Sequence, residues 1–234
     1  SSKTQVPLEP EALVKHLNIN IKRLSSAELL HIANSITDKG MQLTAYLIVQ
    51  NELVERKEYE LAQAINLNGM NVAHMSYKAN LNSLYILLGQ KNYELLLTNL
   101  EATKLNTEDL AFKYYLKAIA QISKGDTASA HKSIDQMLEA LPLYTEAILL
   151  AIDYYEKRGN IDKAYEISAN ALTINHHNTA VKIKLCLLSV PKGLAPFVDK
   201  QLEELKYELS AQDYTAFKAK YDAEVSAQDA KFKW

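Results

Sequence analysis

The side chains that could do chemistry in this sequence are few and scattered. None of the six histidines belongs to a His-Glu-x-x-His motif, the spacing that sets two imidazoles and a base on one helix face. His176 and His177 are adjacent, but they lie in a predicted turn with no carboxylate or Cys at ligand spacing. The histidines therefore predict no metal site. The other four stand singly on predicted helices, at His16, His31, His74 and His131.

Cys186 is the only thiol, and it is the one candidate for a cysteine nucleophile. Its neighbours Leu185, Leu187 and Leu188 place it on an apolar helix face, where a free Cys behaves as a small hydrophobic side chain. We expect a buried, unreactive thiol. A single Cys also excludes an intramolecular disulfide and a metal site made of several cysteines.

Other catalytic patterns are missing as well. Glu203 and Glu204 are paired carboxylates, but Lys200 and Lys206 flank them at salt-bridge spacing, which is typical of a solvated helix face. The six glycines occur singly, so no glycine-rich loop can cradle a phosphate. No Gly-x-Ser-x-Gly motif is present. The sequence predicts no catalytic residue, no cofactor and no enzyme activity.

The charge balance and the length of the apolar stretches argue against nucleic-acid binding and against insertion into a membrane. The chain has 26 basic and 28 acidic residues and a formal net charge of −2, so no overall positive field favours nucleic acid or an anionic membrane. The longest apolar stretches, at 147–152 and 185–190, are far shorter than the roughly 20 residues that cross a bilayer. We expect no nucleic-acid partner and no transmembrane segment.

A spacing of 34 residues organises the chain around these side chains. One column of this period suits turns, and the column five residues later suits helix packing. A period of this length is typical of a solenoid, in which each unit packs only on its neighbours. The first column reads Lys57, Lys91, Gly125, Gly159 and Gly193, and the second Ala62, Leu96, Ala130, Ala164 and Val198.

The clearest unit, 145–178, reads as two helices. Ile148, Ala151, Ile152 and Tyr155 form the apolar stripe of the first helix. Gly159 and Asn160 then break the helix. The second helix has its own stripe, at Ile161, Ala164, Ile167, Ser168, Ala171 and Leu172.

This unit resembles a tetratricopeptide repeat (TPR) over its full length. The features that carry the resemblance are the helix-turn-helix layout, the Gly159-Asn160 turn and the small residues Ala164 and Ala171. The helix-breaking Pro expected after the second helix is His176 here, but it is present as Pro142 in the preceding copy. That copy also keeps Tyr114, Ala118, Gly125, Asp126, Ala130 and Leu138.

The resemblance implies an all-α fold, a right-handed α-solenoid of antiparallel helix pairs (a TPR-like superhelix) with a C-terminal capping helix. We expect an extended tail at 1–10 and a single domain at 11–234. Gly40 should end a first, divergent helix pair, Pro196 should lie in the first turn of a late helix, and Ser210 should cap the last helix. The predicted order is a divergent pair at 11–42, repeats at 43–76, 77–110, 111–144 and 145–178, a degenerate repeat at 179–209 and the capping helix at 210–231.

In the TPR arrangement the first helix of each pair lines a concave face, and the register then places particular side chains there. Tyr85, Phe112 and Tyr115 are the expected aromatic anchors, with Lys78 and Asp153 as polar contacts. The concave groove could also be filled by the protein's own tail or last helix. The full predicted partner-binding set is Asn51, Lys78, Leu81, Tyr85, Phe112, Tyr115, Ile119 and Asp153.

One class of TPR ligand can be tested on the sequence. TPR proteins that bind the acidic C-termini of chaperones use asparagines and basic residues on the inner face. Asn51 and Asn82 stand in the asparagine columns, but the basic columns hold Leu47, Phe112 and Leu116. A carboxylate bound there would lack its cations, at a cost of several kcal/mol. The sequence therefore disfavours a co-chaperone.

The leading hypothesis is a non-catalytic scaffold that binds a peptide or helix of a partner protein in its concave groove. The alternative is an assembly or tethering module of a bacterial cell-envelope complex, bound through its ends or convex face, with Phe232 and Trp234 as a terminal contact. A start at Ser1-Ser2-Lys3 suits a mature lipoprotein, periplasmic or lipid-anchored, and equally a start left by cloning. The oligomeric state is left open.

Overall fold

The computed structural model describes residues 9–72 and 77–232, which form two compact units, unit 1 (1–104) and unit 2 (105–234). The described residues are helical throughout, with thirteen α-helices, one short 3-10 helix and no strand. The fold is the all-α solenoid of helix pairs that the 34-residue spacing predicts. His74, Trp234 and most of the predicted tail lie outside the described residues.

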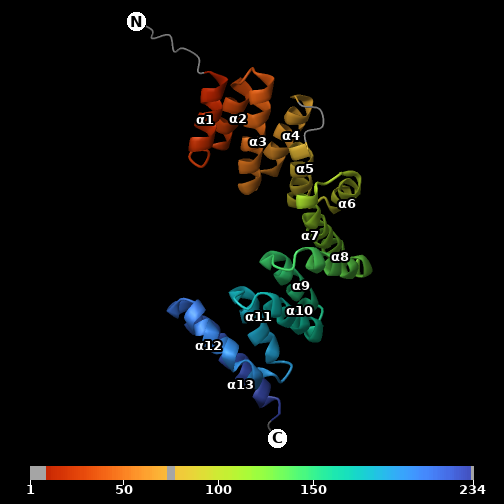
Figure 1. The fold of residues 1–234 in the computed structure, drawn as a ribbon, viewed down its shortest axis with the longest axis vertical. Coiled ribbons are helices and arrows are strands. Elements are labelled where there is room, and N and C mark those ends of the chain that lie inside the picture. Colours follow the sequence, from red (N-terminus) through yellow and green to blue (C-terminus); the bar gives the residue numbers. More distant parts are fainter. Residues whose placement is uncertain (1–8, 73–76, 233–234) are drawn as a thin grey trace. The chain divides into compact units, whose positions relative to one another are not determined.

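Unit 1 contains three successive helix pairs (Figure 1). The first and second helices pack on the third, the third and fourth form the closest antiparallel pair, and the fifth packs on the third and fourth. Its core consists of apolar side chains such as Leu17, Leu29, Val49 and Leu53. The helices are α1 (Pro10–Asn20), α2 (Ser26–Ser35), α3 (Lys39–Glu55), α4 (Tyr59–Val72), α5 (Tyr77–Gly89) and α6 (Tyr93–Ala102).

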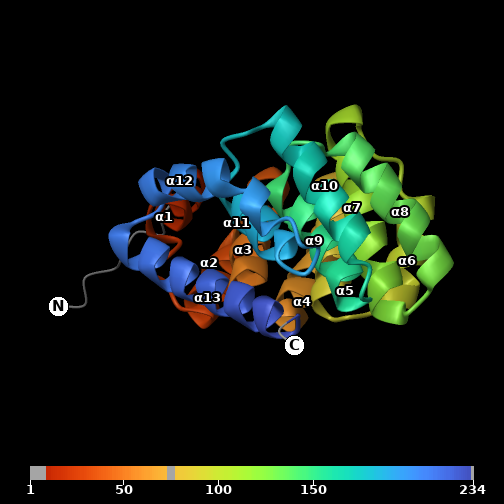
Figure 2. The same ribbon diagram turned by 90° about the horizontal axis from the view of Figure 1, so that it is seen from below.

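Unit 2 continues the pattern with pairs α7/α8 and α9/α10, followed by α11, a 3-10 turn and two more helices (Figures 1 and 2). Ala118, Ala130, Ala151 and Ala164 are all fully buried, and these small side chains let the helices of each pair approach closely. The elements are α7 (Thr107–Lys124), α8 (Thr127–Ala140), α9 (Thr145–Lys157), α10 (Ile161–Ile174), α11 (Thr179–Ser189), η1 (Ala195–Phe197), α12 (Asp199–Glu208) and α13 (Ala211–Ala230).

The 34-residue turn column is explained by backbone conformation. Every member of the column has a positive φ, and in each case the next residue donates its N–H to a carbonyl five residues earlier, as Asn160 does to Tyr155 at 2.9 Å. This bond closes the end of the preceding helix. Two members carry a side chain that disfavours this conformation. The φ values are 63° at Lys57, 58° at Lys91, 78° at Gly125, 76° at Gly159 and 69° at Gly193.

The residue after each turn often begins the next helix. The side-chain oxygens of Asn92, Asp126 and Asn160 each accept the backbone N–H three residues later, at 3.2 Å for Asp126 and 3.1 Å for Asn160. A side chain of this kind satisfies a backbone donor that the helix itself leaves unpaired. The same period therefore sets both the end of one helix and the start of the next.

Two sequence expectations about helix ends are wrong. Gly40 lies inside the first turn of α3, because Asp38 accepts the N–H of Met41 and starts that helix earlier. Pro196 lies in η1, a 3-10 turn that precedes α12, instead of in the first turn of the helix. Pro196 has no N–H to contribute, and the 3-10 turn tolerates this as a helix start does.

The last helix, α13, caps unit 2 as expected. Ser210 accepts the N–H of Asp213 at 3.1 Å and so begins the helix. Phe217 and Tyr221 are buried against α11 and α12, in a cluster with Cys186, while the rest of the helix is largely exposed. A terminal helix with one apolar and one polar face closes the stack.

Candidate partner-binding site

An aromatic cluster in unit 2 brings together two of the predicted anchors. The rings of Phe112 and Tyr115, one turn apart on α7, each meet the ring of Tyr144 edge to face with centroids 5.5 Å apart. All three side chains are partly buried. Edge-to-face aromatic pairs of this kind have a fixed geometry and hold one another in place. The cluster is therefore a preformed apolar surface with accessible area left on it.

Tyr144 is the residue that sequence reasoning missed. It is the N-cap residue of α9, and its side chain turns back toward α7. Burial raises the pKa of its phenol, and the negative charge of Glu146, two residues later in the first turn of α9, raises it further. The only sequence signal was a Tyr in the turn before a helix.

The two remaining predicted residues of unit 2, Ile119 and Asp153, extend this surface along their helices. Ile119 is partly buried two turns after Phe112 on α7, and Leu149 is partly buried one turn before Asp153 on α9. We call the surface formed by Glu108, Phe112, Tyr115 and Ile119 of α7, Tyr144, and Glu146, Leu149, Asp153 and Glu156 of α9 the α7–α9 face.

The sequence predicts Asp153 as a polar contact to a partner, but in the structure this residue already has an ion pair within the protein. Its carboxylate lies 2.7 Å from the ammonium of Lys184 on α11, and Glu156 lies 3.4 Å from the same ammonium. Burial lowers the pKa of Lys184, but the hydrogen bond to Asp153 and the two negative charges outweigh it and raise the pKa overall. Asp153 therefore joins α9 to α11.

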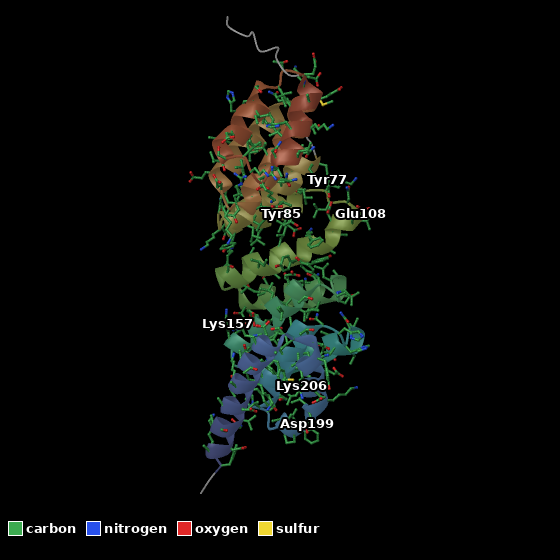
Figure 3. All side chains as sticks on the ribbon, turned by 90° about the vertical axis from the view of Figure 1, so that its left-hand side faces the viewer. Tyr77, Tyr85, Glu108, Lys157, Asp199 and Lys206 are labelled. Carbon is green, nitrogen blue, oxygen red and sulfur yellow. The ribbon has the colours of Figure 1, made fainter. Side chains whose placement is uncertain are left out.

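The other predicted residues belong to unit 1. Asn51 and Lys78 are exposed, while Leu81 and Tyr85 are partly buried on α5. Figure 3 shows Tyr85 on this helix, near its end. The predicted set is thus divided between the two units.

Asn82, in one of the two asparagine columns, takes part in packing within unit 1. Its side chain is buried and its amide donates to Gln50, whose own amide donates to the carbonyl of Ala62 at 3.3 Å. One of the two N–H donors of the Asn82 amide is therefore used inside the protein. Asn82 therefore holds α5 against α3. Asn51, in the other asparagine column, is exposed, so the two asparagines differ in their surroundings.

Unit 2 also contains a buried charge that the sequence analysis did not identify. Glu204 has the expected contact with Lys200, at 4.0 Å, but it also lies 2.7 Å from the ammonium of Lys182, whose side chain is only 2% exposed. Glu208 contacts the same ammonium. One sequence feature could have revealed this contact. Lys182 stands 34 residues after Ile148, which is a buried apolar residue at the equivalent position of the preceding repeat.

No three His, Cys, Asp or Glu side chains in 9–72 and 77–232 are grouped as metal ligands would be. Cys186 is buried as predicted, and burial raises the pKa of its thiol to about 12, so the nucleophilic thiolate does not form near neutral pH. No described helix is long and apolar enough to cross a membrane.

No protein-family model and no curated protein matches this sequence. Solved structures do match. A TPR protein from Parabacteroides merdae ATCC 43184 superposes with a TM-score of 0.62 at 11% identity, covering 95% of this chain and 91% of its own. The chain has the tetratricopeptide repeat fold. A TPR fold is expected from the helix pairs, the positive-φ turns and the buried small residues described above.

Two further TPR-fold comparisons agree. PilF of Pseudomonas aeruginosa superposes with a TM-score of 0.58 at 13% identity, covering 90% of this chain and 97% of its own. A thermophilic TPR protein from Thermus thermophilus gives a TM-score of 0.51 at 15% identity, covering 78% of this chain and 98% of its own. At these identities the likeness extends to the fold alone.

Proposed function

We propose that this TPR protein binds a peptide or helical segment of a partner protein through the inner faces of its helix pairs, without catalysing a reaction. In unit 2 the binding surface is the α7–α9 face, and in unit 1 it includes Asn51, Lys78, Leu81 and Tyr85. The partner's apolar side chains would pack on the aromatic rings.

The observation that carries the proposal is the cluster of Phe112, Tyr115 and Tyr144. Aromatic side chains that hold one another in place lose little conformational entropy when a ligand packs on them, and such residues dominate binding energy at protein interfaces. These three are partly buried, so they are positioned by the fold and still present apolar area.

The proposal is tested by selecting phage that display random 12-residue peptides on the immobilised protein. The recovered peptides are synthesised, and their affinity is measured by fluorescence anisotropy. Replacing both Phe112 and Tyr115 with Ala should weaken binding at least tenfold, because interface aromatics of this kind each contribute about 1–2 kcal/mol or more.

The matched control is Tyr207→Ala on α12, a tyrosine that is 79% exposed and far from the α7–α9 face in sequence. Its affinity should not change. Circular dichroism must show unchanged helicity in all variants. Equal affinity of a well-folded Phe112→Ala, Tyr115→Ala variant would contradict the proposal for unit 2, and the same comparison with Tyr85→Ala tests unit 1.

A second candidate is an assembly module that contacts its partner through the C-terminal end of unit 2. Phe232 is 70% exposed, and it borders a cavity of about 380 Å³ between α13 and the loop at 190–196. An exposed aromatic side chain beside a hollow suits such a contact. Removing residues 226–234 should then abolish any self-association seen in analytical ultracentrifugation, whereas unchanged association would exclude this end as the contact.

A further inference from the structure

The two ends of the α7–α9 face differ in charge. At the end where the helices finish, the carboxylates of Asp153 and Glu156 share the ammonium of Lys184, and Lys157 directly follows Glu156 on α9. At the end where the helices begin, Glu108 and Glu146 are both exposed. Within the described residues neither of these two carboxylates has an ion pair or a hydrogen bond through its side chain.

Glu108 and Glu146 border the aromatic cluster. Glu108 precedes Phe112 by one helical turn, so the two side chains lie on the same side of α7. Glu146 lies two residues after Tyr144, in the first turn of α9, and its charge raises the pKa of the Tyr144 phenol. Two unpaired negative charges therefore stand beside the three rings.

Lysines on the same two helices do not pair with these carboxylates. Lys113 lies one residue after Phe112, on another side of α7, and it already has a partner. Lys157 is at the opposite end of α9; Figure 3 shows it on the opposite edge of unit 2 from Glu108. A carboxylate in the first turn of a helix is favoured by the helix dipole, but that preference leaves its outward oxygens available to a ligand.

From this arrangement we infer that the partner segment is basic and apolar: a Lys or Arg contacts Glu108 and Glu146 while adjacent aliphatic or aromatic residues pack on Phe112, Tyr115 and Tyr144. This inference rests on the proposed function and names its ligand class. A cation at this position gains both from the two carboxylates and from the faces of the tyrosine rings. An acidic segment would meet repulsion there, since the columns that would hold cations contain Phe112 and Leu116.

The test uses the same 12-residue phage library, selected in parallel on the wild-type protein and on Glu146→Lys. The wild type should enrich peptides with Lys or Arg next to apolar residues, and Glu146→Lys should lose that enrichment. For synthetic wild-type-selected peptides, Glu108→Lys and Glu146→Lys should each weaken binding at least fivefold in about 50 mM salt, with a smaller effect in about 500 mM salt because charges at a surface are screened.

Glu139→Lys is the matched control, because Glu139 is an exposed glutamate on α8 and its reversal changes the net charge equally. It should leave affinity unchanged. Selected peptides that lack a basic preference, or that bind Glu146→Lys as tightly as wild type, overturn the inference while the proposed function stands if Phe112→Ala, Tyr115→Ala still loses affinity. Peptides that are indifferent to that aromatic variant overturn both.

Discussion

The ammonium of Lys182 on α11 lies 2.7 Å from the carboxylate of Glu204 on α12, and its side chain is only 2% exposed. Glu208, one turn further along α12, contacts the same ammonium and also accepts the hydroxyl of Thr179 at 2.8 Å. A buried ammonium needs its partners, because without them the charge would be desolvated and unpaired. This contact therefore fixes α12 against α11.

The effect on the free energy of unfolding should depend on which of these three charges is removed. Replacing both Glu204 and Glu208 with Gln leaves Lys182 unpaired and should cost about 2 kcal/mol, because the two glutamate side chains are partly exposed and water can enter beside them to soften the loss. Adding Lys182→Met to that variant should recover most of the loss. Urea unfolding followed by circular dichroism measures both free energies.

Lys182→Met alone is the informative control. Its two carboxylates can turn to solvent, so it should cost less than the Glu204→Gln, Glu208→Gln variant. A triple variant that is no more stable than the double would show that the ammonium is not the source of the loss.

The same contact should make stability depend on pH. Hydrogen bonding from Lys182 lowers the pKa of Glu204 below its ordinary 4.5. In unit 1, burial raises the pKa of Glu52, but the hydrogen bonds from Lys22 and Arg56 outweigh it and lower the pKa overall. Both carboxylates are therefore more acidic when folded, and their contribution to stability is complete above pH 4.5 and lost as pH falls through the lowered pKa.

At alkaline pH, stability should instead fall as pH rises. Burial lowers the pKa of Lys182, but its carboxylate partners raise it above 10.5 overall, so its contribution is complete below pH 10.5 and is lost as pH rises through the raised pKa. Urea midpoints measured across the pH range should fall at both ends. The variant that lacks Lys182, Glu204 and Glu208 should show a shallower fall at each end, and equal slopes would refute this assignment.

The turn register could be predicted from the sequence because it depends on local backbone conformation. A Gly or Lys every 34 residues marks a positive-φ position, and in three copies the Asn or Asp that follows caps the next helix. Both interactions span fewer than six residues, so a repeated local pattern suffices to place them. Ser210 and the burial of Cys186 follow in the same way from neighbouring residues.

The contacts that the sequence did not reveal join different helices. Tyr144 reaches the rings on α7 only because the 141–144 turn brings it back onto that helix. A Lys at position 182 is unexpected, because the equivalent position of the preceding repeat holds the buried Ile148. The structure explains it, because α12 supplies two carboxylates to its ammonium. Periodicity predicts which side of a helix is buried, but it does not say which polar partner another helix brings there.

The positive-φ turns should respond to substitution according to backbone strain alone. A Cβ added at Gly125 or Gly159 meets no atom within 4 Å, so Gly→Ala at either position adds only the cost of a left-handed conformation, about 1 kcal/mol. Lys91→Gly should be neutral or stabilising by up to about 1 kcal/mol, because it relieves that strain at φ 58°.

Gly40→Ala provides the contrast. Gly40 lies in the first turn of α3, and its added Cβ would meet only the Asp38 carboxylate at 3.5 Å, an ordinary contact. Ala in a helix is favoured over Gly by up to about 1 kcal/mol, so this variant should be stabilised. If Gly125→Ala and Gly40→Ala shift the urea midpoint in the same direction, the strain explanation is wrong.

Gly89 at the end of α5 should tolerate no side chain, for a different reason. A Cβ there would lie 2.2 Å from a ring carbon of Tyr59 at the start of α4, so Gly89→Ala must displace the ring. Overpacking of this kind costs about 1–3 kcal/mol. Tyr59→Leu in the Gly89→Ala background should recover part of the loss by freeing the space that the ring occupies. Tyr59→Phe should not recover it, because the ring carbons that meet the Cβ remain. Urea unfolding of the four variants measures the coupling between the two positions; strictly additive free energies for Gly89→Ala and Tyr59→Leu would contradict direct contact.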